Sequence, residues 1–347
     1  MLTFCSGTVR TPKFERTADG GRQRVFVVDE SGNRAPAFEE KNKFLNAQNL
    51  AQLAKDTSFI AIMAVGMAFV IIAGGIDLSV GSIYALASVA GALVFNHFGP
   101  EGAAQAPPFI ALLLGAGACL GTAALCGLFN GGLIVALRVH PFIITLGAMA
   151  ILRGVAFVAT KGQSVGGFPP VLRDIVRFEV GNGLSLVPCL AMILVLVLGW
   201  LHLSRLAAGR RVYAVGGNEQ AARFSGIRVG RVKLGVYLLS GVAAGVAALL
   251  SLGYYGAATS GDGQGYELNV IAAAVVGGCS LNGGRGSALG VVLGALIIQM
   301  IASGIVILGI DQNYSQIIIG AVVIAAVVLD NVNTWLARRR LTAAKAG

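Results

Sequence analysis

Long apolar segments separated by short polar ones dominate the chain after residue 43. The first, Thr57 to Gly75, carries no charge and is long enough to cross the hydrocarbon core of a bilayer, about 30 Å, as a helix. The apolar segments lie at roughly 57–75, 80–95, 109–129, 142–160, 184–203, 234–254, 269–282, 286–308 and 314–330. This pattern predicts an all-α, polytopic membrane protein with about nine (8–10) transmembrane helices. The segments 80–95 and 269–282 are short for a full crossing, which suggests half-helices or tilted, buried helices.

Composition agrees with a membrane protein. The chain is 56% hydrophobic and 12% charged, whereas an average soluble domain is about 25% charged. Its 49 glycines suit closely packed membrane helices. The net charge of +10 comes mostly from basic residues between or beyond the apolar segments, so we interpret it as a topology signal and expect no nucleic-acid partner. Residues 1–43 are polar, mixed in charge and lack the apolar core of a signal peptide, which predicts a poorly ordered tail.

The distribution of Lys and Arg orients the predicted helices. The loop 204–233 holds seven basic residues against one acid, and the tail 332–347 is basic, so both should be cytoplasmic. The loops 96–108 and 255–268 contain no Lys or Arg and should face outward. These four assignments fit nine crossings within a transmembrane domain over 44–331. They also place the basic N-terminal tail outside, against the positive-inside rule, as if a helix before residue 44 were missing.

A carboxylate flanked by glycines interrupts the first two apolar segments, in the sequence GGIDLSVGS of residues 74–82. A charge at membrane depth costs roughly 2.5–3.5 kcal/mol. A chain break there is tolerated only where protein or a water-filled cavity covers it. Asp77 therefore has two compatible interpretations. It caps the helix that follows, or it lies beside a polar pathway through the protein.

An internal repeat extends this observation. Residues 74–93 align without gaps with 277–296, and ten of the twenty positions are identical. In this alignment Asp77 corresponds to Ser280. The feature that the two copies share is therefore the glycine-broken turn GGxxLxxG, and not the carboxylate. With the predicted topology this is a parallel repeat, and broken segments at matching positions of two halves indicate a pathway at their interface. The candidate pathway residues are Gly74, Gly75, Asp77, Ser79, Gly81, Asn130, Gly277, Gly278, Ser280 and Asn282. For Asn130, a turn that ends a helix at the cytoplasmic side is the alternative.

Motifs for nucleotide binding or covalent chemistry are absent from the sequence. The dipeptide Gly-Lys does not occur, so no Walker A loop can be matched, and HExxH and GxSxG are missing too. Five cysteines show no CxxC spacing, and there are only three histidines. We therefore expect a non-catalytic membrane subunit without cofactor or metal. The helices also show no rich aromatic and polar cluster of the kind that binds a sugar tightly.

The cytoplasmic loop contains a short predicted helix. Residues 218–225, NEQAARFS, are good helix formers between two glycines, with Asn218 as N-cap and Glu219 in the first turn. An isolated helix of this length is marginal in water. Either it docks on a cytoplasmic partner, or the segment is a solvated basic loop that only sets topology.

These motifs resemble the permease subunit of bacterial ATP-binding-cassette importers for monosaccharides, the ribose, xylose, arabinose and galactose group. The resemblance extends over residues 44–331. It rests on AGGIDLSVGS (73–82), NGGLIVALRVHPFIITLGAMAILRG (130–154), GRRVYAVGGNEQAARFSGI (209–227), GYELNVIAAAVVGGCSLNGGRGSALG (265–290) and Asp330. It implies the architecture of the cobalamin-importer type in a bacterial inner (plasma) membrane. It also implies three partners: a second permease subunit, identical or different, a cytoplasmic ATPase and a periplasmic sugar-binding protein.

The resemblance assigns a role to the loop helix. In importer permeases a short cytoplasmic helix of the type EAAxxxG fits a groove on the ATPase. The matching residues here are Glu219, Gln220, Ala221, Ala222, Arg223 and Gly226. Gln220 stands where the family pattern has Glu, and Glu219 can supply the charge. The family also has an apolar helix before a segment like 44–50, and the polar tail stands in its place. We interpret this as loss of the first helix by an alternative start, a frameshift or divergence.

The implied function is translocation of a pentose or hexose into the cytoplasm by alternating access, with ATP hydrolysed by the separate ATPase. Three alternatives remain. The first is a secondary transporter that uses Asp77 as a proton or sodium site. The second is a channel or scaffold subunit without pumping. The third is a permease for nucleosides, signalling furanosides or other small polar solutes, since permeases for those look alike.

Overall fold

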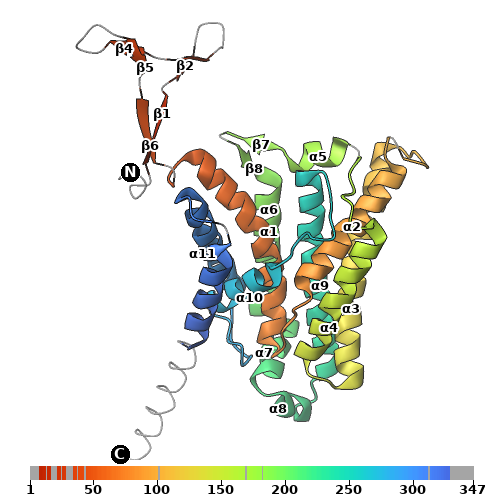
Figure 1. The fold of residues 1–347 in the computed structure, drawn as a ribbon. Coiled ribbons are helices and arrows are strands. Elements are labelled where there is room, and N and C mark those ends of the chain that lie inside the picture. Colours follow the sequence, from red (N-terminus) through yellow and green to blue (C-terminus); the bar gives the residue numbers. More distant parts are fainter. Residues whose placement is uncertain are drawn as a thin grey trace, which may run out of the picture.

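The computed structural model describes most of the chain after residue 43 and short strands before it. The described residues are 8–12, 14–16, 22–24, 26–28, 34–36, 38–42, 44–100, 102–168, 170–181, 183–311 and 313–328. Helices form the body of the molecule (Figure 1). They are α1 (Ala47–Ile72), α2 (Val80–Phe98), α3 (Pro108–Leu137), α4 (Pro141–Thr160), α5 (Pro170–Val176), α6 (Leu186–Ser204), α7 (Ala207–Gly217), α8 (Glu219–Phe224), α9 (Val229–Tyr255), α10 (Tyr266–Val276), α11 (Ala288–Ile307) and Tyr314–Val328.

Seven helices in the described part of the chain are long and apolar enough to cross a membrane, namely α1, α2, α3, α4, α6, α9 and α11. The predicted class, a polytopic helical membrane protein, is confirmed. The structure supports seven full-length spans and not nine, because α10 and Tyr314–Val328 are apolar but shorter. The expectation that 80–95 is short is wrong, since α2 has 19 residues. The 11-residue α10 rises only about 16 Å, roughly half of the hydrocarbon core.

Helix α1 lies at the centre of the bundle, where it contacts α6, α9, α10 and α11 (Figure 1). It begins at Ala47 and not near Thr57. Its first turn is largely exposed, and the residues that follow are partly buried, with Ala51, Leu53 and Lys55 inside. Lys55 is only 3% exposed. Its Nζ lies 3.1 Å from the Asp56 carboxylate and 4.2 Å from the centroid of the Tyr254 ring. An ion pair and an aromatic face thus allow a charged turn to continue an apolar helix.

Small residues bring neighbouring helices together, as the glycine content predicts. Between α3 and α9, a Cβ added at Gly127 would overlap the carbonyl oxygen of Tyr237, and one added at Gly241 would overlap that of Ala123. Close backbone approach of this kind is how membrane helices gain packing energy in a solvent as apolar as their own side chains.

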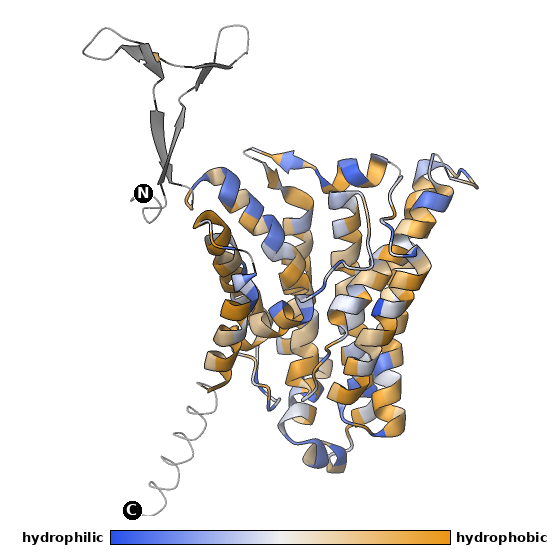
Figure 2. Cartoon of the chain, viewed as in Figure 1, coloured by the Kyte–Doolittle hydropathy of each residue, from blue (hydrophilic) through white to orange (hydrophobic). Residues whose placement is uncertain are grey.

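The two ends of the bundle are more polar than its middle. Figure 2 shows hydrophilic residues gathered on α8 at one end and on α5 and the strands near it at the other. The predicted loop 204–233 consists of α7, α8 and the first turn of α9. A short hairpin precedes α6, formed by β7 (Glu179–Val180) and β8 (Leu184–Ser185).

The described part of residues 8–42 forms three antiparallel strand pairs. They are β1 (Thr8–Pro12) with β6 (Phe38–Asn42), β2 (Phe14–Arg16) with β3 (Arg22–Arg24), and β4 (Phe26–Val28) with β5 (Arg34–Pro36). Much of 1–43 and all of 332–347 lie outside the described residues. The two predicted tails therefore stay predictions.

Candidate functional site

Helix α8 is closed at both ends by its own sequence. The side chain of Asn218 accepts a hydrogen bond from the amide of Ala221 at 2.9 Å, which confirms the predicted N-cap. At the other end Gly226 has φ of 81°, a conformation that favours glycine, and the amide of Ile227 donates to the carbonyl of Ala222 at 3.0 Å. This is a Schellman ending. Two caps explain how a helix of six residues persists in a loop.

Ion pairs attach α8 to the membrane bundle. The Glu219 carboxylate lies 2.8 Å from Nζ of Lys233 on α9 and 3.1 Å from the guanidinium of Arg223. The hydrogen bond from Lys233, with the charges of Lys233 and Arg223, holds the pKa of Glu219 below its usual value. Glu219 is therefore charged at neutral pH, and part of its charge is already paired within the chain.

The two faces of α8 differ in character. Ala222 is buried against Val215 and Val229, and fixes the inner face to α7 and α9. The outer face exposes Gln220, Ala221, Arg223, Phe224 and Gly226. Phe224 is 91% exposed, the kind of apolar side chain that anchors an interface. Five of the six residues predicted to couple to an ATPase thus lie on α8, Gly226 follows its C-cap, and four of the six are exposed.

The first glycine-broken turn joins α1 to α2 and is held by buried polar side chains. Oδ1 of Asp77 accepts from the amide of Ser79 at 3.0 Å and from its hydroxyl at 2.6 Å, and Oδ2 accepts from the hydroxyl of Ser240 at 3.1 Å. The N-cap of α2 is Ser79, so Asp77 closes the turn before the helix instead of capping it. Asn130 donates to the Ser79 hydroxyl at 2.7 Å. It is buried inside α3, which corrects its interpretation as a turn residue.

The second glycine-broken turn joins α10 to α11. Gly277 packs so closely on α11 that a Cβ there would overlap the carbonyl of Gly290, and Gly278 has φ of 91°. Ser280 is buried and its amide donates to the carbonyl of Arg285 at 3.1 Å, whereas Asn282 is exposed. The glycine pair begins two residues after the end of α1, at Gly74, and directly after the end of α10, at Gly277.

The two turns touch each other, and α7 touches both. The amide of Gly284 donates to the carbonyl of Ile72, the last residue of α1, at 2.8 Å. A Cβ at Gly216 of α7 would overlap that same carbonyl, and the hydroxyl of Tyr213 donates to the carbonyl of Gly286 at 2.8 Å. The helix that leads into α8 is therefore in backbone contact with the ends of both broken segments.

A polar cavity of about 570 Å³ lies between α1, α10, α11 and Tyr314–Val328. It is lined by the first turns of α1, so it is at the other end of the bundle from α8 (Figure 1). Its lining is rich in amides and contains no Lys or Arg: Asn49, Gln52, Gln264, Asn269, Gln299, Asn313 and Gln316. Within the described residues, the side chains of Gln264, Asn269, Gln299 and Gln316 make no hydrogen bond. This cluster of amides was not predicted from the sequence.

Comparison with known families decides what kind of protein these features belong to. Residues 49–327 match the family described as the permease component of branched-chain amino acid transport systems. The chain belongs to this permease family.

Relatives of this permease carry names of several import systems. It is 38% identical to the D-allose transport system permease protein of Escherichia coli (strain K12), over 88% of this chain and 89% of the relative. It is 39% identical to the ribose import permease protein of the same strain, over 83% and 87%. It is 33% identical to the autoinducer 2 import system permease protein of Escherichia coli O9:H4 (strain HS), over 86% and 90%. No solved structure matches the chain.

One charged residue of the permease, inside a long apolar helix, was not among the residues predicted from the sequence. Arg153, on the membrane-spanning α4, donates from one guanidinium nitrogen to the carbonyls of Ser260 at 2.9 Å and Asp262 at 2.7 Å. It holds the segment between α9 and α10 close to α2, where a Cβ at Gly81 would press on Gly263 and Glu267. A charge inside an apolar helix could have drawn attention to Arg153. Its partners are backbone carbonyls, which leave no sequence signal.

Proposed function

We propose that this chain is the membrane permease subunit of an ATP-driven importer, and that it moves a monosaccharide into the cytoplasm. The observation that carries the proposal is the contact of α7 with both glycine-broken turns, through Gly216 and Tyr213. It links the cytoplasmic helix α8 to the broken segments of the membrane core. The chain itself is non-catalytic, and a separate ATPase subunit hydrolyses ATP.

In the coupling step, α8 moves as a rigid body together with the segments to which it is tied. Its exposed face, with Gln220, Ala221 and Phe224, would fit a groove of the ATPase. Because Glu219 ties α8 to α9 and Gly216 ties α7 to Ile72, a displacement of α8 by the closing ATPase is transmitted to both turns. Alternating access then follows from movement of the broken segments, which are the natural hinges of a transporter.

The cargo would pass through the amide-lined cavity. An amide both donates and accepts hydrogen bonds, as a sugar hydroxyl does, so free amides can replace the water around a neutral polyhydroxyl solute. The side chains of Asn269 and Gln299 supply such groups from the start of α10 and from within α11. In the predicted topology this cavity faces outward, where a periplasmic binding protein would deliver its sugar.

The finer architecture is also part of the proposal. Among the described residues, we assign the short apolar helices α10 and Tyr314–Val328 as two further crossings, in addition to the seven full-length spans. The parallel repeat of the two glycine-broken turns supports an architecture of the cobalamin-importer type, with two permease subunits around the pathway. The names of the relatives support ribose, allose or a related small polar solute as the cargo.

Uptake into proteoliposomes tests the function. The chain is reconstituted with its ATPase and binding protein, and entry of labelled ribose and allose is measured with internal or external ATP. Uptake should require ATP on the cytoplasmic side and persist with a proton or sodium ionophore. Uptake without ATP that collapses with the ionophore would establish the secondary-transporter alternative instead. The structure offers Asp77 little freedom for that role, since both of its oxygens are hydrogen bonded.

Replacing one amide tests the passage separately. Gln299→Leu removes a hydrogen-bonding group worth roughly 1 kcal/mol, so uptake at low sugar concentration should fall about fivefold to tenfold while ATPase activity is retained. Gln163→Leu, the same change at an exposed residue that does not line the cavity, is the matched control. Equal uptake by both variants would show that the sugar takes another route, and would leave the importer function itself intact.

A further inference from the structure

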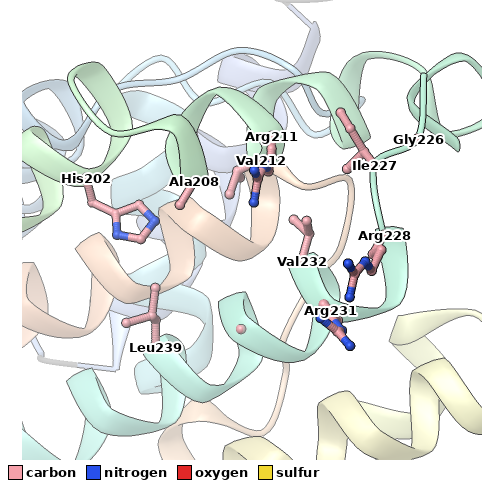
Figure 3. Close-up of a pocket in the computed structure, with 11 residues that line it drawn as sticks. His202, Ala208, Arg211, Val212, Gly226, Ile227, Arg228, Arg231, Val232 and Leu239 are labelled. Atoms are coloured by element: carbon pink, nitrogen blue, oxygen red, sulfur yellow. The ribbon is translucent and has the colours of Figure 1, made fainter.

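A second cavity, of about 420 Å³, lies beside α8 between α6, α7 and the first turns of α9 (Figure 3). One part of its lining is basic, with Arg211 from α7 and Arg228 and Arg231 from the start of α9. Another part is apolar, with Val232 and Leu239 further along α9. The cavity thus has a cationic end and an apolar end.

The positive charge of this cavity is not neutralised by the chain. None of the three guanidinium groups makes a hydrogen bond or ion pair within the described residues, and no acidic side chain lines the cavity. The neighbouring acid, Glu219, is paired with Lys233 and Arg223, neither of which lines it. Three unpaired guanidinium groups around one concave surface call for an anionic ligand with several acceptor oxygens.

The cavity lies at the level where a bilayer meets the cytoplasm. The preceding helix, α6, exposes apolar side chains such as Leu194 and Leu198 over its length, as a lipid-facing helix does. Near its end, Trp200 is exposed and the Arg205 guanidinium lies 5.6 Å from its ring centroid. Tryptophan and arginine at a helix end mark the interface with the headgroups. His202, between these two residues, lines the cavity.

The shape of the lining distinguishes a lipid from a free anion. From Arg228 to Leu239 the wall follows α9 for about 16 Å, from the cytoplasmic end into the membrane. Inorganic phosphate would use only the basic end, whereas a phospholipid would place its phosphate among the arginines and an acyl chain against Leu239. We propose that this cavity binds an anionic phospholipid of the cytoplasmic leaflet.

This site has a consequence for coupling. Gly226 and Ile227, which end α8, form part of the cavity wall. A lipid held there joins α8, α7 and α9 from the side, so it steadies the segment against which an ATPase would push. The proposal depends on the membrane position of α6 and α9 and not on the identity of the cargo.

Native mass spectrometry of the delipidated full-length chain tests the proposal. The probes are phosphatidylglycerol and phosphatidylcholine with identical acyl chains. Wild type should retain phosphatidylglycerol at least about tenfold better than phosphatidylcholine, and Arg228→Gln combined with Arg231→Gln should lose that preference. The matched control is Arg205→Gln combined with Arg210→Gln, which removes two charges from the same end of the bundle outside the cavity lining and should keep the preference. If the first variant fails to fold, Arg211→Gln on α7 provides the same test.

Three results would overturn the proposal. An equal loss of preference in the control would reveal general surface attraction. Displacement of the lipid by inorganic phosphate from wild type would reveal a site for a soluble anion. Absence of any lipid preference, with weaker binding of the ATPase subunit by the Arg228/Arg231 variant, would show that acidic side chains of the ATPase fill the cavity.

Discussion

The two glycine-broken turns share a sequence pattern but are held in place by different means. The turn after α1 is fixed by side chains, since Asp77, Ser79, Ser240 and Asn130 form one buried hydrogen-bonded group. The turn after α10 receives contacts from α1 and α7, through the hydrogen bond from Gly284 to Ile72 and the one from the Tyr213 hydroxyl to Gly286. Side-chain networks in a low-dielectric interior are stiff. We therefore expect the first turn to be stiff, and we expect α7 to act on the second turn because Tyr213 of α7 is hydrogen bonded to it.

The largest expected effect comes from a change that separates α7 from both turns. A methyl group at Gly216 would overlap the carbonyl of Ile72 and crowd Gly284, so Gly216→Ala should abolish uptake. Gly217→Ala is the matched control, because a Cβ there meets no atom within 4 Å. Uptake and ATP hydrolysis are measured on reconstituted protein of equal membrane content. Normal uptake by Gly216→Ala would refute the role of this contact in coupling.

A second change affects α8, through which the ATPase would act on α7, and leaves the two glycine-broken turns intact. Gly226→Asp places a charged side chain at the left-handed end of α8, on the face predicted to meet the ATPase. Transport should be abolished by uncoupling from the ATPase, with normal membrane insertion. ATPase activity is compared with and without binding protein and sugar, with Gly217→Asp as a control of equal charge. Normal uptake by Gly226→Asp would contradict docking of α8.

The sequence predicted the membrane core better than it predicted the contacts that connect it. Apolar length identified each long helix, and the caps of α8 could be inferred from Asn218 and Gly226 because capping is local. The amide cavity could not, since Asn269 and Gln299 come from different segments that each look apolar. The contact of Gly216 with Ile72 could not be predicted either. In the sequence, a close approach of two backbones is marked only by a glycine, and the chain has 49 glycines.

A third prediction concerns the stiff turn. Asp77→Asn keeps an acceptor oxygen for Ser79, so uptake should stay within about threefold of wild type if Asp77 is structural. Asp77→Leu leaves the buried hydroxyls of Ser79 and Ser240 without their acceptor, at a cost of about 1–3 kcal/mol each, and should lower the amount of folded protein. Folded protein is measured by size-exclusion chromatography and uptake by radiolabelled sugar. A well-folded Asp77→Asn protein that hydrolyses ATP but transports nothing would instead place Asp77 on the pathway.

The last change removes a single hydrogen bond between α7 and the second turn. Tyr213→Phe removes the hydrogen bond to Gly286 but keeps the ring, and one neutral hydrogen bond contributes about 0.5–1.5 kcal/mol. If this bond helps α7 to move the second turn, uptake should fall about twofold to tenfold while the stability of the folded protein changes little. Tyr314→Phe, at an exposed tyrosine far from α7 in the sequence, controls for loss of a hydroxyl. A Tyr213→Phe protein that loses stability and keeps full uptake would mean that the second turn is as static as the first, because the bond then supports the fold and not the movement.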